Sequence, residues 1–357
     1  MTVNSASHEP LEQVFDQIQR ESGHEDLTGL TDGDLKFLAR RHWEWAETVA
    51  PGEQDVRVLL EVDGENGDSL SRTILETASP DMPFLVDSVL GECGAQGFEV
   101  AALFHPIVKR QDGRSVSVIQ VHLPILTHDE AARLKAGVRL ALAHNAVAVS
   151  DFEPMRARMQ QEIDRLKGVT HLKEMDRDEA VAFLKWLSRE HFVFLGCREY
   201  EFETNADGQV LPEEPIMVEG SNLGVLRDEE LNVLSREAEP LVLTPEIGAH
   251  LSEPYPILVA KSTLTSLVHR RVACDYVGVK KYDAQGRVNG EVRFLGLFTA
   301  EAYDETARSI PLIRRRIAAI LEASGATPGG HTEKALTNLL ETWPRDELFQ
   351  TSSKILH

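Results

Sequence analysis

The feature that most constrains how this chain can fold is a hydrophobic period that changes repeatedly along it. Residues 9–50 place their apolar side chains at helical spacing, and residues 56–149 mix strand-like with helical runs. Residues 151–187 return to a charged helical pattern, and residues 192–299 are again mostly strand-like. This order predicts two successive α+β units separated by a helical connector, and 357 residues suit about two domains.

Turn and cap signals locate individual elements within these units. Thr127 and Glu130 form a capping-box pattern that predicts the start of a helix. The turn-prone residues 63–68 and 283–286 each predict a hairpin between two strands. Residues 146–149 are expected to form the last strand of the first unit.

Charge and cysteine content argue against several classes of partner. The chain holds 58 Asp and Glu against 37 Lys and Arg, and this net charge of −21 would repel nucleic-acid phosphates and anionic membranes. Cys93, Cys197 and Cys274 are odd in number and far apart, which indicates a reducing compartment rather than disulfides or a thiolate zinc site. The first residues lack a secretory pattern, and no apolar run is long enough for a bilayer. We therefore expect a soluble, cytoplasmic protein with no nucleic-acid or membrane partner.

We find no complete catalytic or cofactor-binding motif in this sequence. The series Gly91, Gly94 and Gly97 comes nearest to a dinucleotide fingerprint, but it has the wrong spacing and precedes a strand, so it predicts a helix C-terminus. His105 and His122 lie on neighbouring predicted strands without a third ligand, which favours a structural role over metal binding. We predict no catalytic residue, no cofactor-binding residue and no metal site.

One junction does offer binding chemistry. A predicted strand ends and a helix begins around Ser79, Asp81, Met82, Pro83 and Phe84, which are our candidate allosteric residues. Free amides at a helix N-terminus can hold a carboxylate, and Asp81 at the cap could accept an ammonium group, so both ends of an amino acid would be bound. The alternative is that Ser79 and Asp81 only cap the helix and that Pro83 lies in its first turn.

The same junction carries a resemblance to a known module. The predicted order of elements over roughly residues 70–150 is similar to the βαββαβ order of an ACT domain, an amino-acid-sensing module. In that family the loop usually reads Asp-x-Pro-Gly-Leu, and its glycine lets the effector carboxylate approach the backbone. Here the loop reads Asp81-Met82-Pro83-Phe84-Leu85, so Phe84 stands at the glycine position.

A longer resemblance covers nearly the whole chain. It is carried, in order, by the motifs at Glu76–Val89, His191–Tyr200, Leu223–Arg227, Lys261–Ser262, Asp275–Lys280, Arg293–Thr299 and Trp343–Phe349. Together they resemble the N-terminal region of the large-subunit, NAD-specific glutamate dehydrogenases of bacteria. In that family this region carries ACT-like modules and a PAS-type module, and the catalytic domain lies further toward the C-terminus. The last helical pattern stops abruptly at His357, so we expect a chain cut short before that domain.

The resemblance implies a division of the chain into five parts. We expect N-terminal helices at 1–50, an ACT-like domain at 51–150, a helical connector at 151–189, a PAS-type domain at 190–305 and a helical segment at 306–357 that leads to absent downstream domains. The fold class expected from both the periodicity and the resemblance is α+β.

The implied function is a non-catalytic regulatory and oligomerisation segment of an NAD-dependent glutamate dehydrogenase. The parent protein would use NAD, and this segment would hold no cofactor. Its implied partners are an amino-acid effector, the downstream catalytic domain of the same chain and further copies in a homo-oligomer, which is a tetramer in the family. Two alternatives stay open: a freestanding amino-acid sensor built from ACT and PAS modules, or an unrecognised enzyme that uses Asp81 or a histidine.

Overall fold

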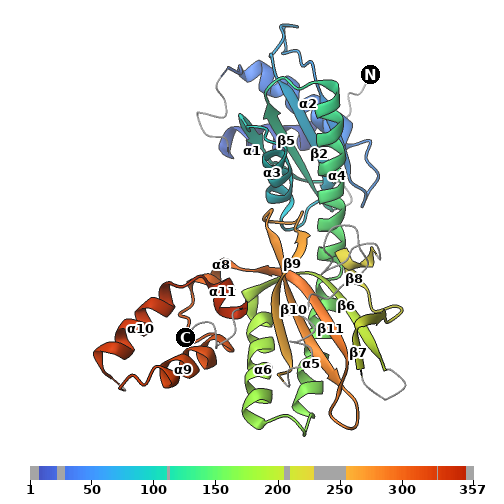
Figure 1. Cartoon of the computed structure of the whole chain (residues 1–357). Helices are drawn as coiled ribbons and strands as arrows, with labels where there is room; N and C mark the ends of the chain where they lie inside the picture. The colour runs from blue at the N-terminus through green and yellow to red at the C-terminus, as the bar shows by residue number, and fades with distance from the viewer. Residues whose placement is uncertain are drawn as a thin grey trace. The chain divides into compact units, whose positions relative to one another are not determined.

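The computed structural model describes residues 8–21, 29–110, 113–204, 210–228, 255–327 and 329–350 (Figure 1). These residues form helices and antiparallel strands, which confirms the predicted α+β class. The chain divides into two compact units. Unit 1 comprises residues 1–149 together with Leu267–Arg271, and unit 2 comprises the remaining residues.

Unit 1 is built around a five-stranded sheet with the order β1-β2-β5-β3, in which β4 also pairs with β5. All of its strand pairs are antiparallel. Its elements are α1 (His8–Glu21), α2 (Asp32–Ala46), β1 (Asp55–Leu59), β2 (Thr73–Pro80), α3 (Leu85–Ala95), β3 (Ala102–Phe104), β4 (Ile107–Lys109), β5 (Ser115–Leu123) and α4 (His128–Ser150).

Helices cover both faces of this sheet, because alternate strand residues point to opposite sides. On one face, Ala78 and Val118 pack against apolar residues of α1 and α2. On the other face, Leu75, Ile119 and Val121 pack against α3 and α4. The central strands are therefore buried on both sides, so any polar group on them must find a partner inside the unit.

Two local predictions for unit 1 can be checked against its hydrogen bonds. The Thr127 hydroxyl accepts a bond from the Glu130 amide at 3.3 Å, and the Glu130 carboxylate accepts one from the Thr127 amide at 2.8 Å, so the capping box is confirmed. The expected strand at 146–149 is wrong, because these residues continue α4. Buried Leu142, Asn145 and Ala148 follow helical spacing, and burial of that helical face outweighs the short strand-like pattern.

Unit 2 contains a six-stranded antiparallel sheet with the order β7-β6-β11-β10-β9, and β8 pairs with β6. Its elements are α5 (Phe152–Lys167), α6 (Glu174–Trp186), the π-helical turn η1 (Leu187–His191), β6 (Phe192–Thr204), β7 (Val210–Met217), β8 (Leu223–Gly224), the 3-10 turn η2 (Val225–Arg227), β9 (Ile257–Thr265), β10 (Ala273–Tyr282), β11 (Val288–Phe298), α8 (Ala300–Asp304), α9 (Ile313–Ala323), α10 (His331–Thr342) and α11 (Arg345–Gln350). The predicted hairpin at 283–286 is confirmed, because β10 and β11 pair across it. Residues 229–254 of the expected PAS-type domain lie outside the described residues.

The core of unit 2 lies on one face of its sheet. Figure 1 shows α5 and α6 side by side along the sheet. Met159 and Phe183 from these helices join Phe194, Val277 and Phe294 from the strands in one apolar cluster, which also includes residues of α9 and α11. The opposite face of the same strands carries charged side chains, which are described below.

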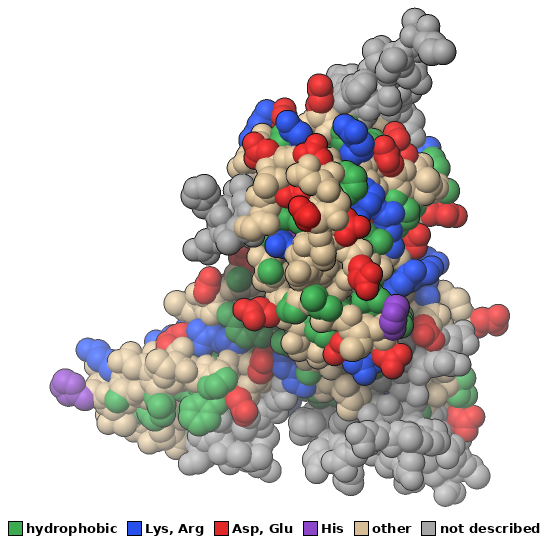
Figure 2. Space-filling model, turned by 90° about the horizontal axis from the view of Figure 1, so that it is seen from above, with side chains coloured by type: hydrophobic (Ala, Val, Ile, Leu, Met, Phe, Trp, Pro, Cys, Tyr) green, Lys and Arg blue, Asp and Glu red, His purple; other side chains and the backbone are tan. Residues whose placement is uncertain are grey.

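Two general properties concern the hydrophobicity of the helices and the distribution of charge on the surface. Among the described helices, none is both long and apolar enough to cross a bilayer. On the face seen in Figure 2, acidic and basic side chains are intermixed rather than gathered into patches of one sign.

Candidate functional site

The predicted loop joins β2 to α3 in unit 1 with an unusual backbone. Phe84 precedes α3 with φ 68° and ψ 8°, a left-handed conformation that a residue with a side chain rarely adopts. Its carbonyl oxygen accepts bonds from the Ser88 amide at 3.0 Å and from the Ser88 hydroxyl at 2.6 Å. The Pro83 carbonyl oxygen accepts a bond from the Asn145 side-chain amide at 2.9 Å. The loop thus keeps the turn that a glycine would favour, although Phe84 occupies the position.

The capping alternative for this loop is wrong. Phe84, and neither Ser79 nor Asp81, is the N-cap of α3, and no side chain caps the helix. Asp81 is exposed, and its backbone amide bonds to the Ser115 carbonyl oxygen at 3.2 Å. Met82 is half-buried and packs against the core under α3. The structure therefore keeps Met82, Pro83 and Phe84 at the helix start but directs Asp81 to solvent.

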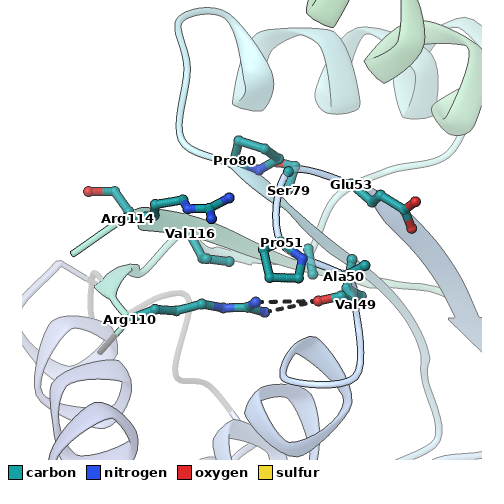
Figure 3. Close-up of a pocket in the computed structure, with 12 residues that line it drawn as sticks. Val49, Ala50, Pro51, Glu53, Ser79, Pro80, Arg110, Arg114 and Val116 are labelled. Atoms are coloured by element: carbon teal, nitrogen blue, oxygen red, sulfur yellow. Dashed lines mark hydrogen bonds between the residues drawn. The ribbon is translucent and has the colours of Figure 1, made fainter. Parts of the chain in front are cut away.

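Ser79 lies instead at the edge of a small pocket (Figure 3). Its hydroxyl is buried and has no hydrogen-bond partner among the residues that the structure describes. Arg110 lines the same pocket, and Figure 3 shows its guanidinium turned to the Val49 carbonyl oxygen, with both bonds at 3.3 Å. The pocket volume is about 60 Å³, whereas small-molecule sites measure ~300 Å³ or more. It has room for a few water molecules and not for an amino acid.

A second segment of unit 1 covers the start of α3. The segment Leu267–Arg271 belongs to this unit, and its His269 ring lies 5.0 Å from the Phe84 ring. The His269 amide donates to the Ser88 hydroxyl at 3.3 Å, and its imidazole Nδ1 bonds to the Asp87 carboxylate at 2.7 Å. The surroundings of the predicted allosteric loop are therefore filled by side chains of the protein itself.

A buried polar network crosses the α2-facing side of the same sheet, and the sequence analysis did not identify it as a network. Glu76 is fully buried and accepts bonds from Arg57 Nε at 2.5 Å and from Gln120 Nε2 at 2.8 Å. His122 Nε2 donates to Gln120 Oε1 at 2.9 Å, and Arg72 donates to His122 Nδ1 at 3.0 Å. Burial, with Arg72 and Arg41 nearby, lowers the pKa of His122 to about 3, so this imidazole is neutral. These groups satisfy one another, and the expected structural role of His122 is confirmed.

Unit 2 holds a comparable network on the sheet face that lacks the apolar core. Arg293 and Glu291 are both buried, and their side chains bond at 3.0 Å. The Tyr276 hydroxyl also bonds to Glu291, and the Arg293 guanidinium lies 4.0 Å from the centre of the Tyr200 ring. Burial and the Glu291 charge raise the pKa of Tyr276 well above its usual range, so its hydroxyl stays protonated as a donor. The alternation of Glu291 and Arg293 with apolar residues is ordinary for a strand with one face in water, so the sequence carries no signal that both charges are buried.

Asp151 forms a further buried anchor in unit 2. Its carboxylate accepts two bonds from Arg227 and one from the Gly224 amide, each at 2.6 Å. These bonds, led by those from Arg227, lower the pKa of Asp151. Asp151 therefore stays ionised and ties the start of α5 to the turn after β8.

The remaining reactive groups are poorly placed for chemistry. Cys93, Cys197 and Cys274 are buried, and burial raises the pKa of each thiol to about 12, as expected for cysteines that act as small apolar residues. In the part of the chain that the structure describes, no three His, Cys, Asp or Glu side chains gather as a metal site would require.

Comparison with known proteins gives matches of two kinds. A family model of the glutamate dehydrogenase ACT1 domain matches residues 14–177, and a model of glutamate dehydrogenase helical motif 1 matches residues 310–357. A solved RNA-binding light-oxygen-voltage receptor aligns with a TM-score of 0.13 and 10% identity, which is too low to indicate a common fold.

Among curated proteins, the NAD-specific glutamate dehydrogenase of Halomonas elongata is 33% identical over 91% of this chain and 21% of that protein. That of Pseudomonas aeruginosa is 32% identical over 95% of this chain and 22% of that protein. That of Mycobacterium tuberculosis is 29% identical over 51% of this chain and 10% of that protein. The chain spans about one fifth of the length of the first two relatives. With two domain models of one family in order and relatives of one kind along most of its length, this chain is an N-terminal region belonging to the NAD-specific glutamate dehydrogenase family.

Proposed function

We propose that this chain is a regulatory and assembly segment, without chemistry of its own, of an enzyme that oxidatively deaminates L-glutamate. The parent reaction would convert L-glutamate, NAD and water to 2-oxoglutarate, ammonia and NADH, on a downstream domain of the same chain. The observation that carries the proposal is the ACT1 match over residues 14–177, within which Phe84, at the glycine position of the ACT loop pattern, has a left-handed backbone.

The mechanism that we propose is thermodynamic linkage between distant sites. An effector or a neighbouring subunit that prefers one arrangement of the parent protein would bias the active site by the difference between its affinities for the two states, typically ~1–3 kcal/mol. The second unit would act as a PAS-type module, which the antiparallel sheet with α5 and α6 on one face supports. A cytoplasmic homo-oligomer completes the proposal.

Two measurements on purified proteins test this function. The 357-residue chain incubated with L-glutamate and NAD should produce no NADH, while the full-length protein should produce it under the same conditions. NADH formation by the 357-residue chain would overturn the non-catalytic assignment. Light scattering should show that the full-length protein is a homo-oligomer and that deletion of this region lowers its oligomeric state. An oligomeric state that the deletion leaves unchanged would exclude the assembly role.

A further inference from the structure

We propose that a cleft in unit 2 binds a free amino acid with an apolar side chain. The cleft lies between the start of α5, the turn η1 and the start of β6. Its volume is about 490 Å³, which falls within the ~300–1,000 Å³ typical of small-molecule sites. The inference deepens the proposed function and rests on it, because this ligand would be the effector of the regulatory segment.

The wall of the cleft is aromatic. Phe192 and Phe194 line it from β6, and both are also buried members of the unit 2 core. Their rings meet edge to face at 5.2 Å, and Phe152 of α5 meets Phe194 at 6.4 Å. Phe152 remains 41% exposed, so it is the ring of this wall with the most surface left open to a ligand. An apolar ligand side chain placed here would bury the open part of that ring, so the wall suits an aliphatic or aromatic body.

The rim of the cleft carries exposed charges of both signs. The side chains of Arg189 and Glu190 are exposed, and neither has an ion-pair or hydrogen-bond partner among the described residues. Arg156 stacks on Phe152 at 5.6 Å and pairs with the exposed Glu153 at 3.1 Å, a contact that water weakens. A guanidinium takes a carboxylate in two parallel bonds, and a carboxylate takes an ammonium group. The free pair therefore complements a zwitterion.

The backbone beneath these two side chains is held in a rare conformation. Glu190 has φ 68° and ψ 11°, a left-handed conformation that is strained for a residue with a side chain. The surroundings maintain it: the Thr299 hydroxyl donates to the Glu190 carbonyl oxygen at 2.8 Å, and the Thr299 amide donates to the His191 carbonyl oxygen at 3.1 Å. The strained turn fixes Arg189 and Glu190 at the rim, where an ordinary helix end would have carried them elsewhere.

Other occupants match this arrangement less well. A simple anion would engage Arg189 but not Glu190, and a simple cation would engage Glu190 but not Arg189. A polar dicarboxylate would leave the exposed part of the Phe152 ring in water. A ligand with a carboxylate, an ammonium group and an apolar body engages all three parts of the cleft.

Calorimetric titration of the 357-residue chain with defined probes tests the proposal. L-Leucine or L-phenylalanine should give saturable binding. 4-Methylpentanoate, which lacks the ammonium group, and 3-methylbutylamine, which lacks the carboxylate, should each bind at least about tenfold more weakly, because each loses one charge-assisted bond. If neither amino acid gives saturable heat up to about 10 mM, or if the two analogues bind as well as leucine, the proposal is overturned.

Substitutions then assign the binding to this cleft. Arg189→Gln and Glu190→Gln should each weaken leucine or phenylalanine binding at least about tenfold with an unchanged unfolding midpoint. Phe152→Ala should weaken binding by a similar factor and also lower the unfolding midpoint, because it removes a contact with Phe194. Arg139→Gln, at an exposed arginine of α4 in unit 1, is the matched control and should leave the Kd unchanged. Equal weakening by Arg139→Gln, or none by the cleft variants, would place the ligand elsewhere and overturn the proposal.

One further comparison separates this ligand from a competing occupant. Binding should persist in the full-length protein. Binding that is present in the 357-residue chain but lost in the full-length protein would mean that another segment of the polypeptide fills the cleft, and would also overturn the proposal. None of these negative binding results would indicate that the segment is catalytic. The NADH measurement therefore tests the proposed function independently of the binding experiments.

Discussion

Acidification should destabilise unit 1 through His122, and the size of the effect follows from its surroundings. Burial, aided by Arg72 and Arg41, lowers the pKa of this imidazole from an ordinary 6.5 to about 3. Below pH 6.5 the unfolded chain binds a proton that the folded chain refuses. The stability that this group provides is therefore complete above pH 6.5 and is lost as pH falls toward 3. Between about pH 7.5 and about pH 5 the loss amounts to ~2 kcal/mol for this one group.

The test compares the wild-type chain with His122→Gln, which can still accept from Arg72 and donate to Gln120 but cannot titrate. Hydrogen exchange of the β5 amides at both pH values gives an opening free energy for unit 1. His42 is also buried with a lowered pKa, but both proteins retain it, so its contribution cancels in the comparison. The wild type should lose ~2 kcal/mol more than the variant on acidification. Equal losses in the two proteins would show that His122 is not held neutral, and would refute the reasoning.

Three further sets of substitutions probe backbone strain and buried charge. Gly224 has φ 60° and ψ −141°, and a Cβ there would overlap a backbone carbonyl oxygen, so Gly224→Ala should lower the unfolding free energy by more than ~3 kcal/mol. Gly220→Ala, at φ 75° with open space around it, should cost about 1 kcal/mol in the same urea titration, and equal costs would exclude the overlap as the cause. Asp151→Ala should cost unit 2 about 2–4 kcal/mol, because a buried backbone amide and a guanidinium lose their acceptor; an unchanged melting temperature would contradict this. Phe84→Gly should stay within about 1 kcal/mol of wild type and Phe84→Val should lose at least about 2 kcal/mol, and the reverse order in thermal melting would contradict a strained turn.

Local chemistry made several elements predictable from the sequence. The Thr127 and Glu130 pair specifies its cap by bonds between neighbours, and the hairpin at 283–286 depends on its own turn residues. The strand expected at 146–149 failed because a short apolar run is ambiguous, and the packed face of α4 decided its conformation. Sequence reasoning succeeded where the interactions that determine a local conformation lie within a few adjacent residues.

The candidate site was less predictable because its causes are not local. Nothing in the sequence shows that Phe84 adopts a left-handed turn, since its propensity opposes that conformation and bonds from Ser88 and Asn145 maintain the loop. Ser79 was a candidate allosteric residue, with helix capping as the alternative, but β2 continues through it and buries its hydroxyl. The sequence analysis did not identify Arg189 and Glu190 as the rim of a cleft, because their position depends on how η1 connects α6 to β6.

The buried charges of unit 2 also bear on how its strands find their alignment during folding. In the native pairing, Lys280 on β10 lies opposite Glu291 on β11, so opposite charges are cross-strand neighbours. A slip of two residues would keep every side chain on its own face, so the apolar pattern alone would resist it weakly. One such slip would set Lys280 opposite Arg293, placing two cations together away from water, where their repulsion is strong. The cross-strand pairing of Lys280 with Glu291 thus favours the native alignment of β10 and β11 over this slipped one.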